Sequence, residues 1–436
     1  MRTSIYPWDV QAWRTALRTA GIPGFALLAL LLGTMIEFSA PSTAGPGHSS
    51  TAQLVFVRGP LCLLALLLLL FRPRVSRLRL TDTRFGFLAF GLLYLISTLW
   101  SAEPVVTLGK SAEIVLAVLT FLEVSRSANA LQRVEALKQI ILLTISLIAV
   151  ITVTGYALHI HAFVQPRPGL FTRTTAQAPF LSGNGLGYVA SALFLVIFAE
   201  WQAGRIRAAS AFSQMAFALL VFSVAASRTS FAILILSVIL VIARKSKIAA
   251  VLASAALLFT AVLYKSILVR SLQGNESSKG FASLSGRTVV WAAALRTWQE
   301  HPFLGVGGGV GGKVVVSHIA DYSLQQMSSL HNGFMELLTG LGSIGFLIGM
   351  YLLLQVTWRV WKAWEIHPEY SGTYVLIVHA WLTTIMSTGV FGWMGYEMAF
   401  FLCILTNIDL VQRVPVMVAS APFLMDRRSA FAVVAK

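Results

Sequence analysis

Long apolar runs separated by short polar segments dominate the chain. Each run approaches the roughly 20 residues that cross the hydrocarbon core of a bilayer. They lie at 22–38, 52–71, 85–100, 105–124, 139–160, 186–202, 209–226, 227–243, 248–268, 332–358, 373–390 and 392–411. Backbone groups inside lipid must find hydrogen-bond partners within their own segment, so the runs predict helices. The pattern therefore predicts an all-α, polytopic integral membrane protein with about twelve transmembrane helices.

The composition agrees with a lipid environment. Apolar residues make up 57% of the 436 positions and charged residues only 11%, which is far from the balance of a soluble domain. Cys62 and Cys403 are the only cysteines, and both lie inside predicted spans. The sequence thus provides no disulfide framework and no cluster of metal ligands, and we expect no metal and no cofactor.

Positive charge is concentrated on one predicted side of the membrane. With the N-terminus inside, 22 of the 33 Lys and Arg residues fall in inner segments, as the positive-inside tendency predicts. Much of the net charge of +16 therefore follows from topology, and we expect membrane lipids but no nucleic acid as partners. Arg2, Arg14 and Arg18 precede the first run, which lacks a clear cleavage site, so we expect a retained signal anchor.

The remaining cations fall on the predicted outer side. They are Arg58, Lys110, Arg167, Arg173, Arg228, Lys265, Arg270, Lys279, Arg287, Arg296 and Lys313. An unpaired cation near the membrane midplane costs roughly 2.5–3.5 kcal/mol, so such residues usually meet an anion. The alternatives are snorkelling to lipid phosphate or pairing with a glutamate. Arg228, directly before an apolar run, and Arg287 are the best candidates for binding an anionic ligand.

Two outer segments, 159–185 and 269–331, are long enough to build a site, because loops of more than about 12–15 residues are usually functional or disordered. The predicted organisation is a bundle of about nine helices at 1–268, a large periplasmic loop at 269–331, further transmembrane helices at 332–412 and a cytoplasmic tail at 413–436.

The second half of the larger loop predicts a helix that lies in the outer interface. Arg287, Trp291, Leu295 and Trp298 recur at helical spacing, and Pro302 ends the pattern. The following glycine segment, 305–312, could converge its N–H groups on an anion or form a featureless flexible turn. Without the strand and helix of a phosphate-binding loop, we favour the flexible turn.

His331 ends the loop where the next apolar run begins, at a predicted helix N-terminus that favours anions. A histidine in this position is more often a cap or an interfacial residue than a catalyst. Glu336, about one turn further on, could orient His331 or pair with an outer arginine. We assign His301 no chemical role, because His-Pro after a helix is typical of a helix end.

Several motifs in the chain resemble those of the bacterial O-antigen ligase and polysaccharide polymerase superfamily. They are Ser285-Gly-Arg287, Trp291, Glu300-His-Pro-Phe-Leu-Gly-Val-Gly307, His331-Asn332 and Leu341-Gly-Ser-Ile-Gly345, with Leu99-Trp-Ser101 and Ser227-Arg228 as weaker support. The chain departs from the family pattern at 169–184, where twelve residues separate Gly169-Leu-Phe171 from Asn184.

The resemblance implies a membrane-embedded (GT-C-like) glycosyltransferase that acts on undecaprenyl-diphosphate-linked glycan at the periplasmic face, without a metal. Arg228 and Arg287, with Arg173 as a third choice, would bind the diphosphate. His331 would act near the acceptor hydroxyl, as general base or as an orienting hydrogen-bond partner, supported by Glu336. Asn332 and Trp291 belong to the same motifs. Direct displacement would invert the anomeric centre.

Three functions remain open at this point. A polymerase would extend an exopolysaccharide or capsule, a ligase would transfer finished glycan to lipid A-core, and a transporter or lipid flippase would catalyse no transfer. We lean to the polymerase, because the outer loops carry no further acceptor signature. Lys110 and Glu113 inside a predicted span keep the transporter alternative open. Other polysaccharide-assembly proteins are possible partners.

Overall fold

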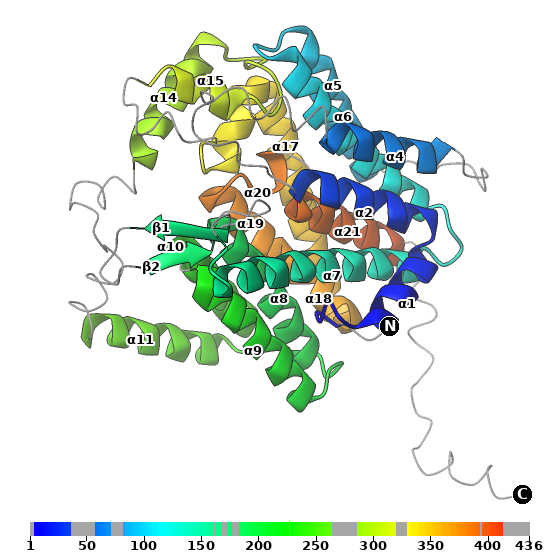
Figure 1. Cartoon of the computed structure of the whole chain (residues 1–436), viewed down its shortest axis with the longest axis vertical. Coiled ribbons are helices and arrows are strands. Elements are labelled where there is room, and N and C mark those ends of the chain that lie inside the picture. The colour runs from blue at the N-terminus through cyan, green and yellow to red at the C-terminus, as the bar shows by residue number, and fades with distance from the viewer. Residues whose placement is uncertain are drawn as a thin grey trace, which may run out of the picture.

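The computed structural model describes residues 4–35, 57–70, 82–160, 163–167, 173–176, 183–225, 227–263, 286–319, 329–392 and 395–412 (Figure 1). The first part of the large loop, 269–285, and the tail, 413–436, lie outside these residues. The helices are α1 (Val10–Ala20), α2 (Ile22–Met35), α4 (Gly59–Leu70), α5 (Asp82–Ile96), η2 (Ser97–Leu99), α6 (Pro104–Val124), α7 (Ala130–Ala157), α8 (Gly183–Gln202), α9 (Ala208–Ala225), α10 (Arg228–Lys245), α11 (Lys247–Leu263), α14 (Arg287–Glu300), α15 (Gly311–Ser317), α17 (Gly333–Ile366), η4 (Pro368–Tyr370), α18 (Ser371–Tyr374), α19 (Leu376–Met386), α20 (Gly389–Gly392) and α21 (Tyr396–Val411).

The predicted all-α class is confirmed apart from one short hairpin in the first outer segment. Strands β1 (Val164–Arg167) and β2 (Arg173–Ala176) pair antiparallel, with Arg167 opposite Arg173. Pro166 disfavours a helix here, and β-branched valine and threonine favour extended backbone. The hairpin packs against α7 and α9 through β2.

Each of the predicted apolar runs contains helix, although their ends differ from those expected. Among the described residues, the five helices α6, α7, α8, α9 and α17 are long and apolar enough to cross a membrane, and the bent pair α1–α2 would make a sixth. The chain is therefore a multi-pass membrane protein. The number of twelve crossings stays a prediction, as does the position of the large loop on the periplasmic side.

Helix α8 lies at the centre of the bundle. It contacts α7, α9, α10, α18 and α19, and its residues from Leu186 to Val189 are all buried, which means that it is surrounded on every side. The first turn of α8 lies close to the elements that carry the candidate site.

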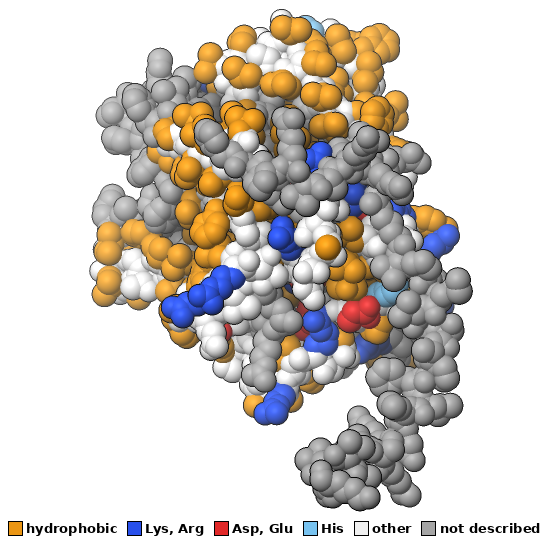
Figure 2. Space-filling model, turned by 90° about the vertical axis from the view of Figure 1, so that its right-hand side faces the viewer, with side chains coloured by type: hydrophobic (Ala, Val, Ile, Leu, Met, Phe, Trp, Pro, Cys, Tyr) orange, Lys and Arg blue, Asp and Glu red, His pale blue; other side chains and the backbone are white. Residues whose placement is uncertain are grey.

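Ion pairs join helices on the predicted inner side, where most of the lysine and arginine residues lie in the sequence. Arg84 of α5 lies 3.0 Å from Asp409 of α21, and Arg359 of α17 lies 2.5 Å from the same carboxylate. Lys138 of α7 contacts Glu200 of α8 at 3.3 Å. Figure 2 shows one face of the molecule, where hydrophobic side chains cover the upper part and Lys and Arg appear mainly below.

Helix α17 is broken at Gly342, whose φ of 66° interrupts the helical backbone. The break leaves Thr339 and Gly340 carbonyls and the Ser343 N–H without partners inside the helix. The segment 302–307 supplies them: the N–H groups of Val306 and Gly307 donate to Thr339 and Gly340 at 2.9 Å, and the Pro302 carbonyl accepts from Ser343 at 2.8 Å. Irregular backbone is thereby satisfied by protein, as a membrane protein requires.

The glycine segment 305–312 is consequently no flexible turn, and our prediction for it was wrong. Nearly all of it is buried, and a Cβ at Gly305 would meet the Gly340 backbone at 2.5 Å. Its N–H groups do not converge on one point either, because Gly308 donates to the Ser97 hydroxyl and Gly312 to the Glu336 carboxylate. The absence of side chains lets this segment enter the break of α17.

Replacement of Gly342 by alanine is expected to destabilise the protein strongly. A Cβ there would lie 2.3 Å from the Phe303 backbone, in addition to the strain of a positive φ, which alone costs about 1–3 kcal/mol. Gly204→Ala is the matched control, since Gly204 has φ 73° but no atom within 4 Å of its Cβ position. Thermal unfolding in detergent should show a much larger drop in Tm for Gly342→Ala; equal drops would contradict the role of close packing.

Candidate functional site

His331 stands directly before α17, as the sequence predicted, in an unusual backbone conformation. Asn332 is the N-cap of the helix, and its Oδ1 accepts from the N–H groups of Phe334 and Met335 at 3.0 and 3.1 Å. His331 itself has φ 50°, the left-handed region that non-glycine residues rarely adopt. Such strain persists only where the surroundings hold the residue in place, and it is common at functional sites.

Two side chains hold the residue that precedes His331. The indole Nε1 of Trp291 donates to the Leu330 carbonyl at 2.9 Å, and the Leu330 N–H donates to Glu336 at 2.8 Å. Both backbone groups of this fully buried leucine are therefore bound. Glu336 does not pair with an outer arginine in the described contacts; its second carboxylate oxygen accepts from Gly312. Among these contacts, the glutamate binds the backbone next to His331 and not its imidazole.

Arg287 is the first residue of α14, and its guanidinium binds the end of another helix. Its Nη1 donates to the Met386 carbonyl, the last residue of α19, at 3.3 Å. The sequence predicted one continuous span at 373–390, which was wrong, because α19 stops at Met386 and α20 starts at Gly389. The Ser-Thr-Gly sequence after Met386 is a break signal that could have revealed this. The free carbonyl at a helix C-terminus favours a cation.

Helix α14 places Arg287 one turn before Trp291, which donates to Leu330, the residue directly before His331. Burial, and secondarily the positive charge of Arg287, lower the pKa of His331 to about 4. The imidazole is therefore neutral at physiological pH and has a nitrogen that can accept a proton. A fixed cation beside a neutral base is an arrangement that can bind an anionic leaving group and deprotonate a nucleophile.

Arg228 is half-buried in the first turn of α10, and α8 connects this turn to Arg287. Ser227, the N-cap of α10, donates to Asn184 Oδ1 at 2.9 Å. One turn further along α8, the Tyr188 hydroxyl donates to the Met386 carbonyl, the same acceptor that Arg287 binds. No pattern in the sequence pointed to Tyr188, since a tyrosine inside an apolar helix is unremarkable.

Arg173, the third candidate, lies in β2 next to α7 and α9. Its backbone is placed by the hairpin, but its side chain lies outside what the structure describes, so its role in binding a diphosphate stays a prediction.

Three other outer cations have protein partners. Lys313 contacts Glu103 at 2.5 Å, Arg58 lies 3.6 Å from Glu113, and Lys110 donates to the Gly309 carbonyl. Pairing with a glutamate, one of the alternatives for the outer cations, is therefore found for Lys313 and Arg58, whereas Lys110 binds a backbone carbonyl. His301 follows α14 as its C-cap, as expected.

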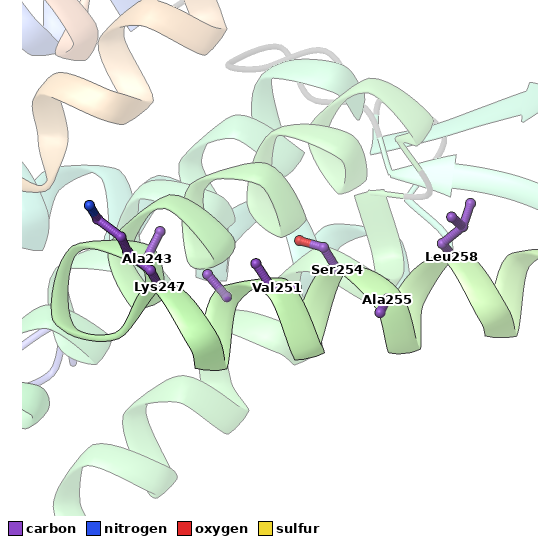
Figure 3. Close-up of a pocket in the computed structure, with 7 residues that line it drawn as sticks. Ala243, Lys247, Val251, Ser254, Ala255 and Leu258 are labelled. Atoms are coloured by element: carbon purple, nitrogen blue, oxygen red, sulfur yellow. The ribbon is translucent and has the colours of Figure 1, made fainter.

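Two surface grooves lie apart from these residues. One, of about 510 Å³, runs along α11 between Lys247 and Leu258 (Figure 3). The other, of about 500 Å³, is bounded by Trp100, Ala102 and residues 301–306. Neither is lined by Arg228, Arg287 or His331, so a cavity shared by these three residues stays a prediction. Within the described residues, no group of three metal-ligand side chains lies close together.

The low pKa of His331 predicts an unusual pH profile for any reaction that needs the neutral imidazole. With a pKa of about 4, kcat/KM should change little between pH 7 and pH 5.5 and fall only as the pH approaches 4. An ordinary histidine, with a pKa near 6.5, would lose roughly tenfold by pH 5.5. Initial rates measured from pH 7 down to pH 4 test this prediction. A fall in kcat/KM centred near pH 6.5 would contradict a low pKa for His331.

Residues 214–350 match the family model described as O-antigen ligase. The matched part runs from α9 to the middle of α17 and includes Arg228, Arg287 and His331, so the resemblance predicted from the motifs is confirmed. Asn184 and Tyr188 lie outside it. A search of curated proteins finds no match to the chain.

Proposed function

We propose that the chain is a glycosyltransferase that moves an oligosaccharide from undecaprenyl diphosphate to an acceptor hydroxyl, at the periplasmic face of a bacterial inner membrane. The observation that carries the proposal is the hydrogen bond from Trp291 to Leu330, which joins the first turns of α14, with Arg287, to the backbone next to His331. The segment that contains both residues matches the O-antigen ligase family. A site that only binds an anion would need the Arg287 guanidinium but would not need the neutral imidazole of His331.

In the proposed step, the acceptor oxygen attacks the anomeric carbon of the donor sugar. The bond from that carbon to the diphosphate oxygen breaks, and its electron pair leaves with the diphosphate. The hydroxyl proton passes to the unprotonated ring nitrogen of His331. Arg287 and Arg228, with Arg173 as a third cation, bind the diphosphate through guanidinium groups that match phosphate oxygens and stay charged. A single displacement of this kind inverts the anomeric centre and requires no metal.

The remaining candidate residues support this geometry. Trp291 and Glu336 hold Leu330, and Asn332 caps α17, so the backbone on both sides of His331 is fixed. A catalytic group that is already positioned avoids an entropic cost during the reaction.

Within this class we favour a polymerase that lengthens an exopolysaccharide or capsule over a ligase that uses lipid A-core. The outer loops contain no further signature of a particular acceptor. The polysaccharide profile of a deletion strain tests the choice: loss of a polymerase leaves single lipid-linked repeat units, whereas loss of a ligase accumulates lipid-linked polymer.

Transfer by the purified protein tests the proposal as a whole. The protein in detergent, without any gradient, is expected to form new glycosidic bonds from a lipid-linked oligosaccharide and to release undecaprenyl diphosphate. Transport without bond formation in proteoliposomes would overturn it and favour the transporter. That alternative rested on Lys110 and Glu113, whose contacts with Gly309 and Arg58 give both a structural role.

A further inference from the structure

Tyr188 is a buried residue of α8, with 3% of its surface exposed, whose hydroxyl lies in a polar cluster. Its hydroxyl donates to the Met386 carbonyl over 3.4 Å. Arg287 donates to the same carbonyl at 3.3 Å. Tyrosine and arginine therefore meet at the end of α19.

The same turn of α8 also packs on the start of α10. A Cβ at Gly187 would lie 2.5 Å from the Ser230 hydroxyl and 3.0 Å from Ser227, so α8 and α10 approach closely here. The Ser230 hydroxyl donates to the Asn184 carbonyl at 3.2 Å. Residues 184–188 of α8 thus contact the start of α10, and through Tyr188 they share the Met386 carbonyl with Arg287.

We propose that Tyr188 is a positioning residue that holds the Arg287 guanidinium ready for the donor diphosphate. The inference rests on the proposed function and adds a residue to it. The phenol can donate to the Met386 carbonyl and accept from an Arg287 N–H, while the guanidinium keeps further N–H donors for a ligand. An arginine side chain has about 2 kcal/mol of rotamer entropy to lose on binding, and a partner that orders it beforehand lowers this cost.

The test is a double-mutant cycle measured on equilibrium binding of a prenyl diphosphate, farnesyl diphosphate, to the purified full-length protein. Tyr188→Phe removes only the hydroxyl and is expected to weaken binding about tenfold, with KM for the lipid-linked donor rising far more than kcat falls. In an Arg287→Ala background the same change should have almost no effect, because the group that Tyr188 positions is gone.

Tyr374→Phe is the matched control, since the Tyr374 hydroxyl is buried and has no hydrogen-bond partner among the described residues. It should leave farnesyl diphosphate binding unchanged. Unchanged binding by Tyr188→Phe, or an equal loss with and without Arg287, would overturn the positioning role while leaving the proposed function intact. If the unmodified protein does not bind farnesyl diphosphate at all, the proposed function is wrong, and the positioning role of Tyr188 is then wrong as well.

Discussion

Replacement of His331 by asparagine is expected to abolish glycan transfer while the protein still folds and inserts. Asparagine tolerates the left-handed backbone that His331 adopts with φ 50°, so it is a better substitution than alanine. It has no ionisable nitrogen to take up the acceptor proton. Loss of a general base typically costs 10²–10⁴-fold, and we expect a loss of at least about a hundredfold in kcat.

The measurement combines transfer rates from purified variants with their abundance in the membrane. His301→Asn makes the same chemical change at the exposed C-cap of α14, where asparagine is well tolerated, and should retain full activity. Undiminished transfer by His331→Asn, or the same loss in both variants, would show that His331 is not the base.

The sequence predicted well those features that are set by neighbouring residues. Helix α14 starts at Arg287 and ends before Pro302, and α17 begins after the cap at Asn332, because caps and prolines act locally. The apolar runs likewise identified where helices form, since each must satisfy its own backbone in lipid.

Features that depend on distant partners could not be predicted in this way. The glycine segment is buried and hydrogen-bonded because α17 breaks at Gly342 and exposes carbonyl groups that the segment can bind. Tyr188 shares the Met386 carbonyl with Arg287, which lies about a hundred residues further along the chain. Likewise, Glu336 accepts from the N–H of Leu330, next to His331, a contact that helical spacing does not indicate.

The buried side of α14 was also difficult to predict from the sequence. The stripe with Trp291 and Leu295 predicted the helix, yet Val290, Ala294 and Thr297 are its buried residues, and α14 packs on α15 and α17. Both tryptophans of the stripe use their indole N–H to bind backbone carbonyls, Trp291 at Leu330 and Trp298 at Pro302.

Removal of the Arg287 guanidinium is expected to reduce transfer by roughly 10²–10³-fold, the usual consequence of losing one preorganised group that stabilises developing negative charge. Arg287→Lys keeps the charge but loses the planar fork, so it should restore part of the activity. Arg296→Ala, at an exposed position of the same helix, provides the control and should transfer normally.

Arg287→Ala should also change the pH profile of whatever activity remains. The charge of Arg287 contributes to the low pKa of His331, so without it that pKa should rise from about 4 towards, but not to, its ordinary value, because burial is the larger cause. A higher pKa protonates the base at a higher pH, and the acidic limb of kcat/KM should therefore move upward. Two results would contradict this: an acidic limb that stays in place, or a loss of the same size in Arg296→Ala. Either would show that Arg287 and His331 do not act in one site.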